Sequence, residues 1–179
     1  GNGHTGLDTG RTRAVLDAVA KASGWGRAVA PRSGLGIAFY FSHRGYFASV
    51  VEVKVADEGT VSVVKVWVAG DVGRQIVNPS GANNQIVGST LDAINATLNQ
   101  QITVANGRVE QNNFDDYPLL RLPDAPPVEV QILASDNPPT GLGEPAYPPV
   151  PPAIGNAIFA ATGVRVRSLP VDTALLKKA

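Results

Sequence analysis

One carboxylate, that of Glu144, stands in the segment of the chain best suited to chemistry. It belongs to the run Gly141-Leu142-Gly143-Glu144-Pro145, which is flanked by further prolines and followed by a small-residue helix expected over 153–163. Glycine lets another molecule approach the backbone closely, and proline fixes the backbone angle φ. A carboxylate on such a stiff loop can serve as a general base. The residues alone leave open the alternative of an exposed loop carboxylate without a role.

Other ionisable residues indicate sites less strongly. Adjacent Asp115 and Asp116 are suited to paired acid and base work, but neighbouring side chains of an extended chain point apart, which favours a solvated loop. Asp71, close to Gly73, is as typical of a turn after a strand as of a phosphate or metal loop. His43 follows a predicted strand, and we expect a hydrogen-bonded structural histidine there.

The composition excludes several classes of site. The 179 residues include 15 basic and 15 acidic side chains, so no net charge favours nucleic acid or an anionic membrane surface. There is no cysteine, which excludes disulfides, thiolate nucleophiles and iron–sulfur ligation by these residues. The two histidines, His4 and His43, are too few for a histidine-rich metal site, and we predict no metal ligands. No apolar run approaches the roughly 20 residues that span a bilayer.

The first part of the chain predicts a helix followed by three strands. Apolar residues from Val15 to Ala22 recur at helical spacing behind a capping residue, Asp8 or Thr9, and Gly24 is expected to end this helix. Alternation of apolar and polar residues predicts strands over 36–41, 47–55 and 60–68. The alternation slips near Val64, which predicts a bulge or two buried faces.

The second part adds a helix, further strands and a last helix. Asn78 and Pro79 favour a helix start, and Gly88 inside that helix costs ~1 kcal/mol relative to alanine, which usually has a packing reason. Asn106-Gly107 predicts a hairpin turn. Strands are expected over 102–104, 108–110, 128–133 and 164–169. The order predicts a single α+β domain over 1–179, with a mixed, mainly antiparallel sheet and two or three helices packed on one side.

Three groups of residues occur along the chain in a specific order. They are Asp71-Val72-Gly73-Arg74 with Val77-Asn78-Pro79 and Gln85-Ile86-Val87-Gly88, then Asn113 to Arg121, then Gly141 to Pro145. Together they resemble the molybdenum-binding large subunit of the xanthine dehydrogenase and aldehyde oxidase family. The branch with the strongest resemblance is the isoquinoline 1-oxidoreductase β subunit and similar bacterial aldehyde dehydrogenases. Each group alone is a weak signal, but their order and spacing over 13–170 are specific.

The resemblance implies a role for each residue that matches the family pattern. Glu144 corresponds to the general base beside the molybdenum, which takes a proton from the oxygen that attacks an electron-poor substrate carbon. The backbone of Gly141-Leu142-Gly143 is expected close to the metal–pterin centre. Gln85 matches a glutamine near the pterin, and its amide both donates and accepts hydrogen bonds. The family's double glycine is here Gly88-Ser89, which departs from the pattern beside Gln85.

The resemblance also implies a parent protein several times longer than this chain. Residues 1–179 are expected to be the C-terminal part of its large subunit, with a separate iron–sulfur subunit and the rest of the large subunit as partners. The implied cofactor is molybdopterin cytosine dinucleotide with molybdenum. The parent would hydroxylate an aldehyde or N-heteroaromatic substrate with water as the oxygen source, in a bacterial cytoplasm or periplasm. The isolated chain would then be inactive, because the other cofactor loops lie upstream.

A second hypothesis comes from a different class of protein. The chain could be a stand-alone, non-catalytic interaction or scaffold domain that retains the fold without the cofactor. Its length favours this alternative, and the intact run around Glu144 disfavours it. A long reading frame that continues upstream, next to a gene for an iron–sulfur subunit, would support the enzyme. A start codon at this position would support the stand-alone domain.

Overall fold

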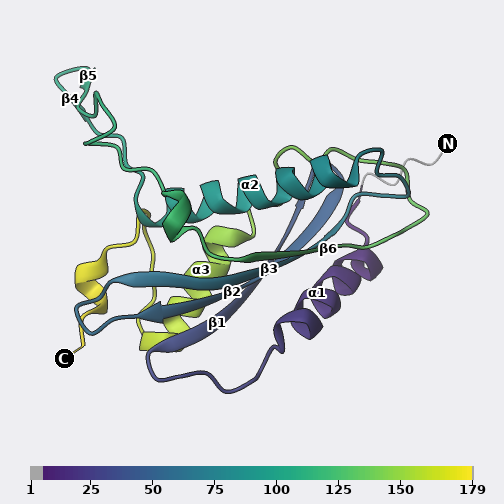
Figure 1. Ribbon diagram of the computed structural model, residues 1–179, viewed down its shortest axis with the longest axis horizontal. Helices are drawn as coiled ribbons and strands as arrows, with labels where there is room; N and C mark the ends of the chain where they lie inside the picture. Colours follow the sequence, from purple (N-terminus) through teal and green to yellow (C-terminus); the bar gives the residue numbers. More distant parts are fainter. Residues whose placement is uncertain (1–5, 179) are drawn as a thin grey trace.

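The computed structural model describes residues 6–178, and His4 lies outside them. A four-stranded sheet forms the centre, in the order β1-β2-β3-β6 (Figure 1). Its strands are β1 (Ser33–Ser42), β2 (Gly45–Val55), β3 (Val61–Asp71) and β6 (Val128–Ile132). The first three are antiparallel neighbours, whereas β6 runs parallel to β3. A mixed, mainly antiparallel sheet with helices confirms the α+β class.

Within residues 6–178, helices cover both faces of this sheet: two pack on one side, which confirms the expectation of two or three helices there, and a third covers the opposite side. The three are α1 (Thr9–Ser23), α2 (Pro79–Leu98) and α3 (Val150–Thr162). Val15 and Val19 of α1 pack against one face, where Tyr46 and Trp67 are buried. The other face packs against α2 and α3. The reason is that β2 has buried residues on both of its faces, so neither face tolerates solvent.

The starts and ends of the helices follow local signals. The Asp8 carboxylate accepts hydrogen bonds from the first backbone N–H groups of α1, and Gly24 ends α1 in the left-handed conformation at φ 62°. Asn78 caps α2 and Pro79 is its first residue. The capping expectations at all four positions are therefore confirmed.

The predicted irregularity of the third strand is a β-bulge. Glu52 pairs with Lys65, but the next residue, Val53, pairs with Val63. Val64 is the extra residue of β3 and is exposed. Because one inserted residue changes the phase of the alternation, Val61 and Val63 before the bulge and Val66 and Val68 after it pack against the same core.

A long excursion separates α2 from β6, and we call residues 99–127 the arm. It contains β4 (Val104–Ala105) and β5 (Arg108–Val109), joined by the predicted turn at Asn106-Gly107, and the short 3-10 helix η1 (Leu122–Asp124). β4 and β5 pair only with each other among the described residues. The hairpin extends away from the body, at the upper left of Figure 1.

The last predicted strand, over 164–169, does not form. This segment has no regular structure before the 3-10 helix η2 (Thr173–Leu176). Its side chains do alternate between two environments. Val164 and Val166 pack on the main core, while the guanidinium of Arg165 lies 3.4 Å from the ring centre of Phe159. Its apolar side is thus partly buried on the core without a strand partner.

Close contact between β1 and α3 depends on glycine. A Cβ at Gly36 would overlap the backbone of Ala153 and Ala157 in α3. Gly36→Ala is therefore expected to destabilise the chain by about 1–3 kcal/mol, because a rigid helix backbone must move. The control is Gly155→Ala on α3, where the Cβ position is open space. This substitution should not destabilise the chain. Urea unfolding of both variants checks this, and equal stabilities would contradict it.

No helix within residues 6–178 has the length and apolar character required to cross a bilayer.

Candidate functional site

The loop that carries Glu144 forms a cavity of about 700 Å³ together with α2 and the end of β1. Three residues predicted from the sequence meet there, namely Gln85, Gly143 and Glu144. The remaining lining residues are Tyr40, Ser42, Gly88, Ser89, Asp92, Tyr147 and Pro148. The cavity therefore combines hydroxyl, amide and carboxylate groups with two aromatic rings.

Gly141 and Leu142 lie beside this cavity and do not line it. Leu142 is half-buried against the main core and lines a neighbouring cavity of about 280 Å³. Gln85 lines both cavities, so the α2 side chain and the loop are next to each other. A Cβ at Gly141 would come 3.8 Å from the Cβ of His43. The glycine run thus passes along the mouth of the site.

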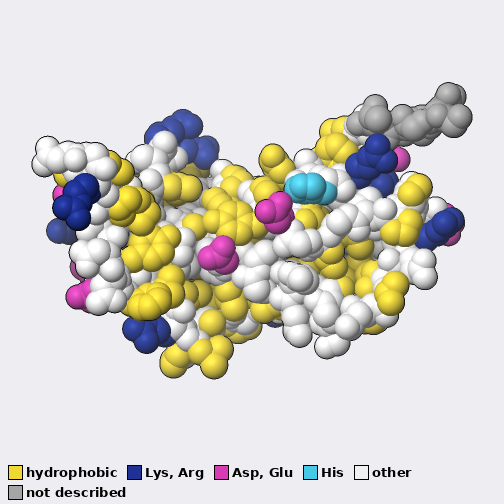
Figure 2. Space-filling model, turned by 90° about the horizontal axis from the view of Figure 1, so that it is seen from above, with side chains coloured by type: hydrophobic (Ala, Val, Ile, Leu, Met, Phe, Trp, Pro, Cys, Tyr) yellow, Lys and Arg dark blue, Asp and Glu magenta, His cyan; other side chains and the backbone are white. Residues whose placement is uncertain are grey.

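The Glu144 carboxylate lies at the surface of the described residues, with 80% of its side chain exposed. Its Oε2 atom is 3.8 Å from Nε2 of His43, whose Nδ1 lies 2.8 Å from the Ser42 hydroxyl. His43 sits in the left-handed turn between β1 and β2. Figure 2 shows a histidine beside an acidic side chain on this face. The carboxylate is therefore accessible to a ligand and free to accept a proton from one.

Tyr147 and Asp92 belong to the site but were not predicted from the sequence. Burial raises the pKa of the Tyr147 phenol, and the charges of Asp92 and Tyr117 raise it further. The phenol therefore stays protonated at neutral pH and can donate a hydrogen bond into the cavity. In the sequence, only the closeness of Tyr147 to Glu144 connects it with the site. In the structure the two residues share a turn, in which the Tyr147 N–H donates to the Glu144 carbonyl at 2.9 Å.

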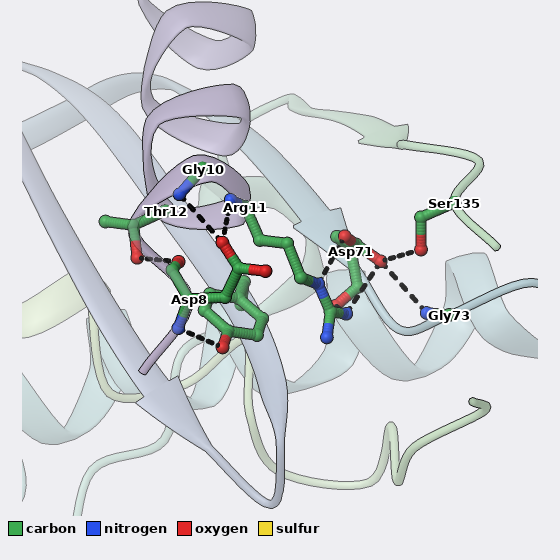
Figure 3. A network of polar contacts seen from close by, with 8 residues as sticks. Asp8, Gly10, Arg11, Thr12, Asp71, Gly73 and Ser135 are labelled. Atoms are coloured by element: carbon green, nitrogen blue, oxygen red, sulfur yellow. Dashed lines mark hydrogen bonds and ion pairs between the residues drawn. The ribbon is translucent and has the colours of Figure 1, made fainter. Parts of the chain in front are cut away.

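A polar network at the end of β3 helps to hold the segment that leads to the Glu144 loop (Figure 3). The carboxylate of Asp71 accepts hydrogen bonds from Arg11 Nε at 2.7 Å, Arg11 Nη2 at 2.9 Å, the Ser135 hydroxyl at 2.8 Å and the Gly73 N–H at 3.0 Å. Burial alone would raise the pKa of Asp71, but these donors outweigh it and lower the pKa. Asp71 is thus part of a structural network that includes its turn.

This network connects α1 with the segment that leads to Glu144. The N–H of Arg74 donates to the carbonyl of Asn137, and the N–H of Thr140 donates to the carbonyl of Val72, both at 2.9 Å. Gly73, at φ 95°, lies so close to the Pro138 carbonyl that a Cβ would overlap it. The segment immediately before the Gly-Leu-Gly-Glu run is therefore attached to the end of β3.

The cavity has the features required for a flat ligand with a polar edge. A Cβ at Gly143 or Gly88 would meet no protein atom within 4 Å, so the backbone at both positions is open to close approach. The amide of Gln85 and the phenol of Tyr147 face the same cavity and offer both donors and acceptors. The hydroxyl of Thr140, at the start of the loop, is buried without a hydrogen-bond partner among the described residues.

Replacement of Gly88 by alanine is expected to raise the stability of the chain and to weaken ligand binding. The expected packing reason is wrong, because Gly88 is exposed and borders the cavity. Gly88→Ala should stabilise the chain by about 1 kcal/mol, since alanine is the better helix former. The added methyl group would narrow the cavity and weaken ligand retention in the full-length protein. Urea unfolding of the 179-residue chain and metal analysis of the full-length protein check both parts, and a destabilised variant would contradict the first.

Asp115 and Asp116 do not form an acid–base pair. Both are exposed, and the Asp116 carboxylate accepts hydrogen bonds from the backbone N–H groups of Asn112 and Asn113 at 3.0 Å. Those bonds lower the pKa of Asp116. The solvated-loop interpretation is confirmed.

Within residues 6–178, no group of three or more His, Asp or Glu side chains is arranged to hold a metal ion.

Comparisons with known proteins match this chain to a family of cofactor-binding domains. A family model described as molybdopterin cofactor-binding domain matches residues 14–126, which include Gln85 and end before Glu144. Isoquinoline 1-oxidoreductase subunit beta of Brevundimonas diminuta is 35% identical over 169 residues. The membrane-bound aldehyde dehydrogenase (pyrroloquinoline-quinone) of Gluconacetobacter polyoxogenes is 35% identical over 170 residues. Each alignment covers 92% of this chain but only 22% of the relative.

A solved structure agrees with the fold. Quinoline 2-oxidoreductase from Pseudomonas putida 86 superposes with a TM-score of 0.62 and 25% identity, over 70% of this chain and 17% of that one. The chain therefore spans about a fifth of the length of these known proteins. The sequence match and the superposition together show that the chain belongs to the molybdopterin cofactor-binding domain family.

Proposed function

We propose that this chain is the C-terminal part of a molybdenum hydroxylase large subunit, with Glu144 as the general base of its reaction. One observation carries the proposal: Gln85, Gly143 and Glu144 come from a helix and a distant loop and line one cavity. These three residues all match the family pattern, and they meet although about 60 residues separate the helix from the loop. The membership of the chain in a cofactor-binding family indicates what the cavity faces.

The residues present fit a molybdopterin cofactor. The open backbone at Gly143 would lie along it, with Gly141 and Leu142 beside the cavity, and the amide of Gln85 would bind the polar edge of the pterin. The phenol of Tyr147, which lines the same cavity, would donate a second hydrogen bond. The cytosine dinucleotide form is the one that the resemblance implies. The bound cofactor supplies the redox chemistry, whereas the protein supplies binding, orientation and proton transfer.

Glu144 would act on the oxygen nucleophile, which derives from water. In the complete subunit its carboxylate would face the reacting atoms across the cavity. A base within hydrogen-bond reach of the proton that it abstracts contributes roughly 10²–10⁴-fold to the rate. The proton then resides on a Glu144 carboxylate oxygen and leaves to solvent when the product departs.

The relatives support a proposal for the substrate class and the partners. Their names refer to isoquinoline, quinoline and aldehyde substrates, so we assign an aldehyde or an N-heteroaromatic compound with an electron-poor carbon. A protein named subunit beta has at least one partner subunit. We assign a separate iron–sulfur subunit as that partner, because the family resemblance implies one.

A comparison of two proteins tests the proposal. The full-length subunit, produced with its neighbouring iron–sulfur subunit, should retain molybdenum and oxidise aldehydes or N-heterocycles. The 179-residue chain should do neither, because it contributes only one side of the cofactor site. Metal analysis and dye-reduction assays measure both properties. Tight binding of molybdopterin cytosine dinucleotide to the isolated chain, or a full-length subunit without molybdenum, would overturn the proposal.

A further inference from the structure

The turn between β1 and β2 has a backbone conformation that its residues rarely adopt. Ser42 pairs with Gly45 across the hairpin, so His43 and Arg44 form a two-residue loop. Both lie in the left-handed region, at φ 52° and φ 64°. Such loops usually contain Asn-Gly, because a Cβ atom disfavours positive φ. Residues in strained conformations cluster at active sites and ligand-binding sites, so the two side chains of this loop are candidates for a function.

This turn packs against the loop that carries Glu144. A Cβ at Gly141 would come 3.8 Å from the Cβ of His43, and a Cβ at Gly45 would come 3.5 Å from a side-chain atom, the Oγ1 of Thr140. Nε2 of His43 lies 3.8 Å from Oε2 of Glu144. That distance exceeds a hydrogen bond of about 3 Å, but 58% and 80% of the two side chains are exposed, which leaves both free to rotate closer. The imidazole is therefore within reach of the proposed base.

The second ring nitrogen of His43 determines what Nε2 can do. Nδ1 lies 2.8 Å from the Ser42 hydroxyl, which can accept a hydrogen bond from an Nδ1–H group. A neutral imidazole carries one ring proton, so a proton on Nδ1 leaves Nε2 as an acceptor. Asp92 also lines the cavity, but among residues 6–178 the carboxylate paired with His43 is that of Glu144. Nε2 thus faces the base with a free lone pair.

We propose that His43 relays the proton of the reaction from Glu144 to solvent. In this step the O–H bond at Oε2 of protonated Glu144 breaks, and an N–H bond forms at Nε2 of His43. The imidazolium then releases its proton to water, and the Glu144 carboxylate is restored for the next turnover. The inference rests on the proposed function, in which Glu144 takes that proton. His43 is a positioning residue, because it acts only through Glu144.

Nitrogen NMR of the 179-residue chain tests the tautomer without any cofactor. The chain contains two histidines, His4 and His43, so His4→Gln leaves the signals of one imidazole. We expect the neutral ring of His43 to carry its proton on Nδ1. Ser42→Ala removes the acceptor of that proton and should move part of the population to Nε2. A neutral ring protonated on Nε2 in the parent chain would overturn the proposal, because that atom could not accept a second proton.

Turnover of the full-length subunit tests the relay itself. His43→Gly should lower turnover at least about tenfold at low buffer concentration, because the proton acceptor is lost. Free imidazole should restore turnover, since a dissolved base can take the proton in its place. The same substitution should raise the urea midpoint of the 179-residue chain, because glycine adopts positive φ readily. Arg44→Gly is the matched control: it relieves the neighbouring left-handed residue, keeps the imidazole, and should turn over like the parent.

Glu144→Gln separates this inference from the proposed function. Without the base there is no proton to relay, so imidazole should not restore turnover in that variant. Full turnover of His43→Gly at low buffer concentration would overturn the relay and leave Glu144 as the base. A lowered urea midpoint of His43→Gly, together with lost turnover that imidazole does not restore, would make His43 a structural residue and also overturn the relay. Full turnover of Glu144→Gln would overturn both proposals.

Discussion

Glu144→Gln in the full-length subunit is expected to lower turnover by roughly 10²–10⁴-fold, the usual contribution of a positioned base. The amide has nearly the shape of the carboxylate but cannot accept the proton. Because 80% of the Glu144 side chain is exposed, its replacement removes no buried contact of this chain. Molybdenum content should therefore remain near normal. Steady-state kinetics and metal analysis of the same preparation measure the two quantities.

The control for Glu144 is the other carboxylate of the cavity. Asp92→Asn makes the same chemical change on α2 and should reduce turnover far less, because no proton transfer is assigned to Asp92. Unfolding free energies of both variants in the 179-residue chain should stay within about 0.5 kcal/mol of the parent value, as for surface changes generally. Retained turnover in Glu144→Gln would remove Glu144 from the mechanism, and lost molybdenum would make it a binding residue.

Asp71→Asn should be the most destabilising of the conservative changes considered, at about 3–5 kcal/mol. Asp71 and Arg11 are nearly buried, with 4% and 14% of their side chains exposed. The substitution leaves the partly buried Arg11 guanidinium without its counter-ion, with little access to water. Asp17→Asn is the matched control, since its ion pair with Arg13 is exposed and should contribute at most ~0.5 kcal/mol. Urea unfolding at pH 7 compares the two.

The same pair predicts a dependence of stability on pH. The pKa of Asp71 is lower in the folded chain than its ordinary value of 3.8, so the unfolded chain binds the proton more readily. This contribution is complete above pH 3.8 and is lost as the pH falls through the folded pKa. The difference in unfolding free energy between the parent chain and Asp71→Asn should therefore shrink below pH 3.8. A difference that stays constant down to pH 2 would contradict the assignment.

Local features of the fold could be predicted because their causes are local. Caps at Asp8 and Asn78 satisfy the first N–H groups of helices from nearby side chains. The bulge at Val64 follows from a slip in the alternation of its own strand. The hairpin at Asn106-Gly107 needs only two residues that tolerate positive φ. In each case a few adjacent residues contain the physical cause.

Other features depend on which segments meet. Alternation at 164–169 is the same whether its apolar side packs on a helix or in a sheet, so the sequence could not decide between them. The placement of α1 opposite α3 required knowledge that both faces of β2 are covered. Tyr147 and Asp92 have no pattern of their own, and only their shared cavity assigns them to the site.

The sequence by itself determined the α+β class and the starts of α1 and α2, and it singled out Glu144 as a candidate, since periodicity, caps and the order of motifs are properties of the chain. Only the tertiary structure decided that Gln85 and Glu144 line one cavity, because segments distant along the chain become neighbours through packing on a sheet. It also decided that Asp71 helps to hold the loop and that the imidazole of His43 lies close to the Glu144 carboxylate. Burial and exposure depend on every surrounding element, and no local pattern contains that information.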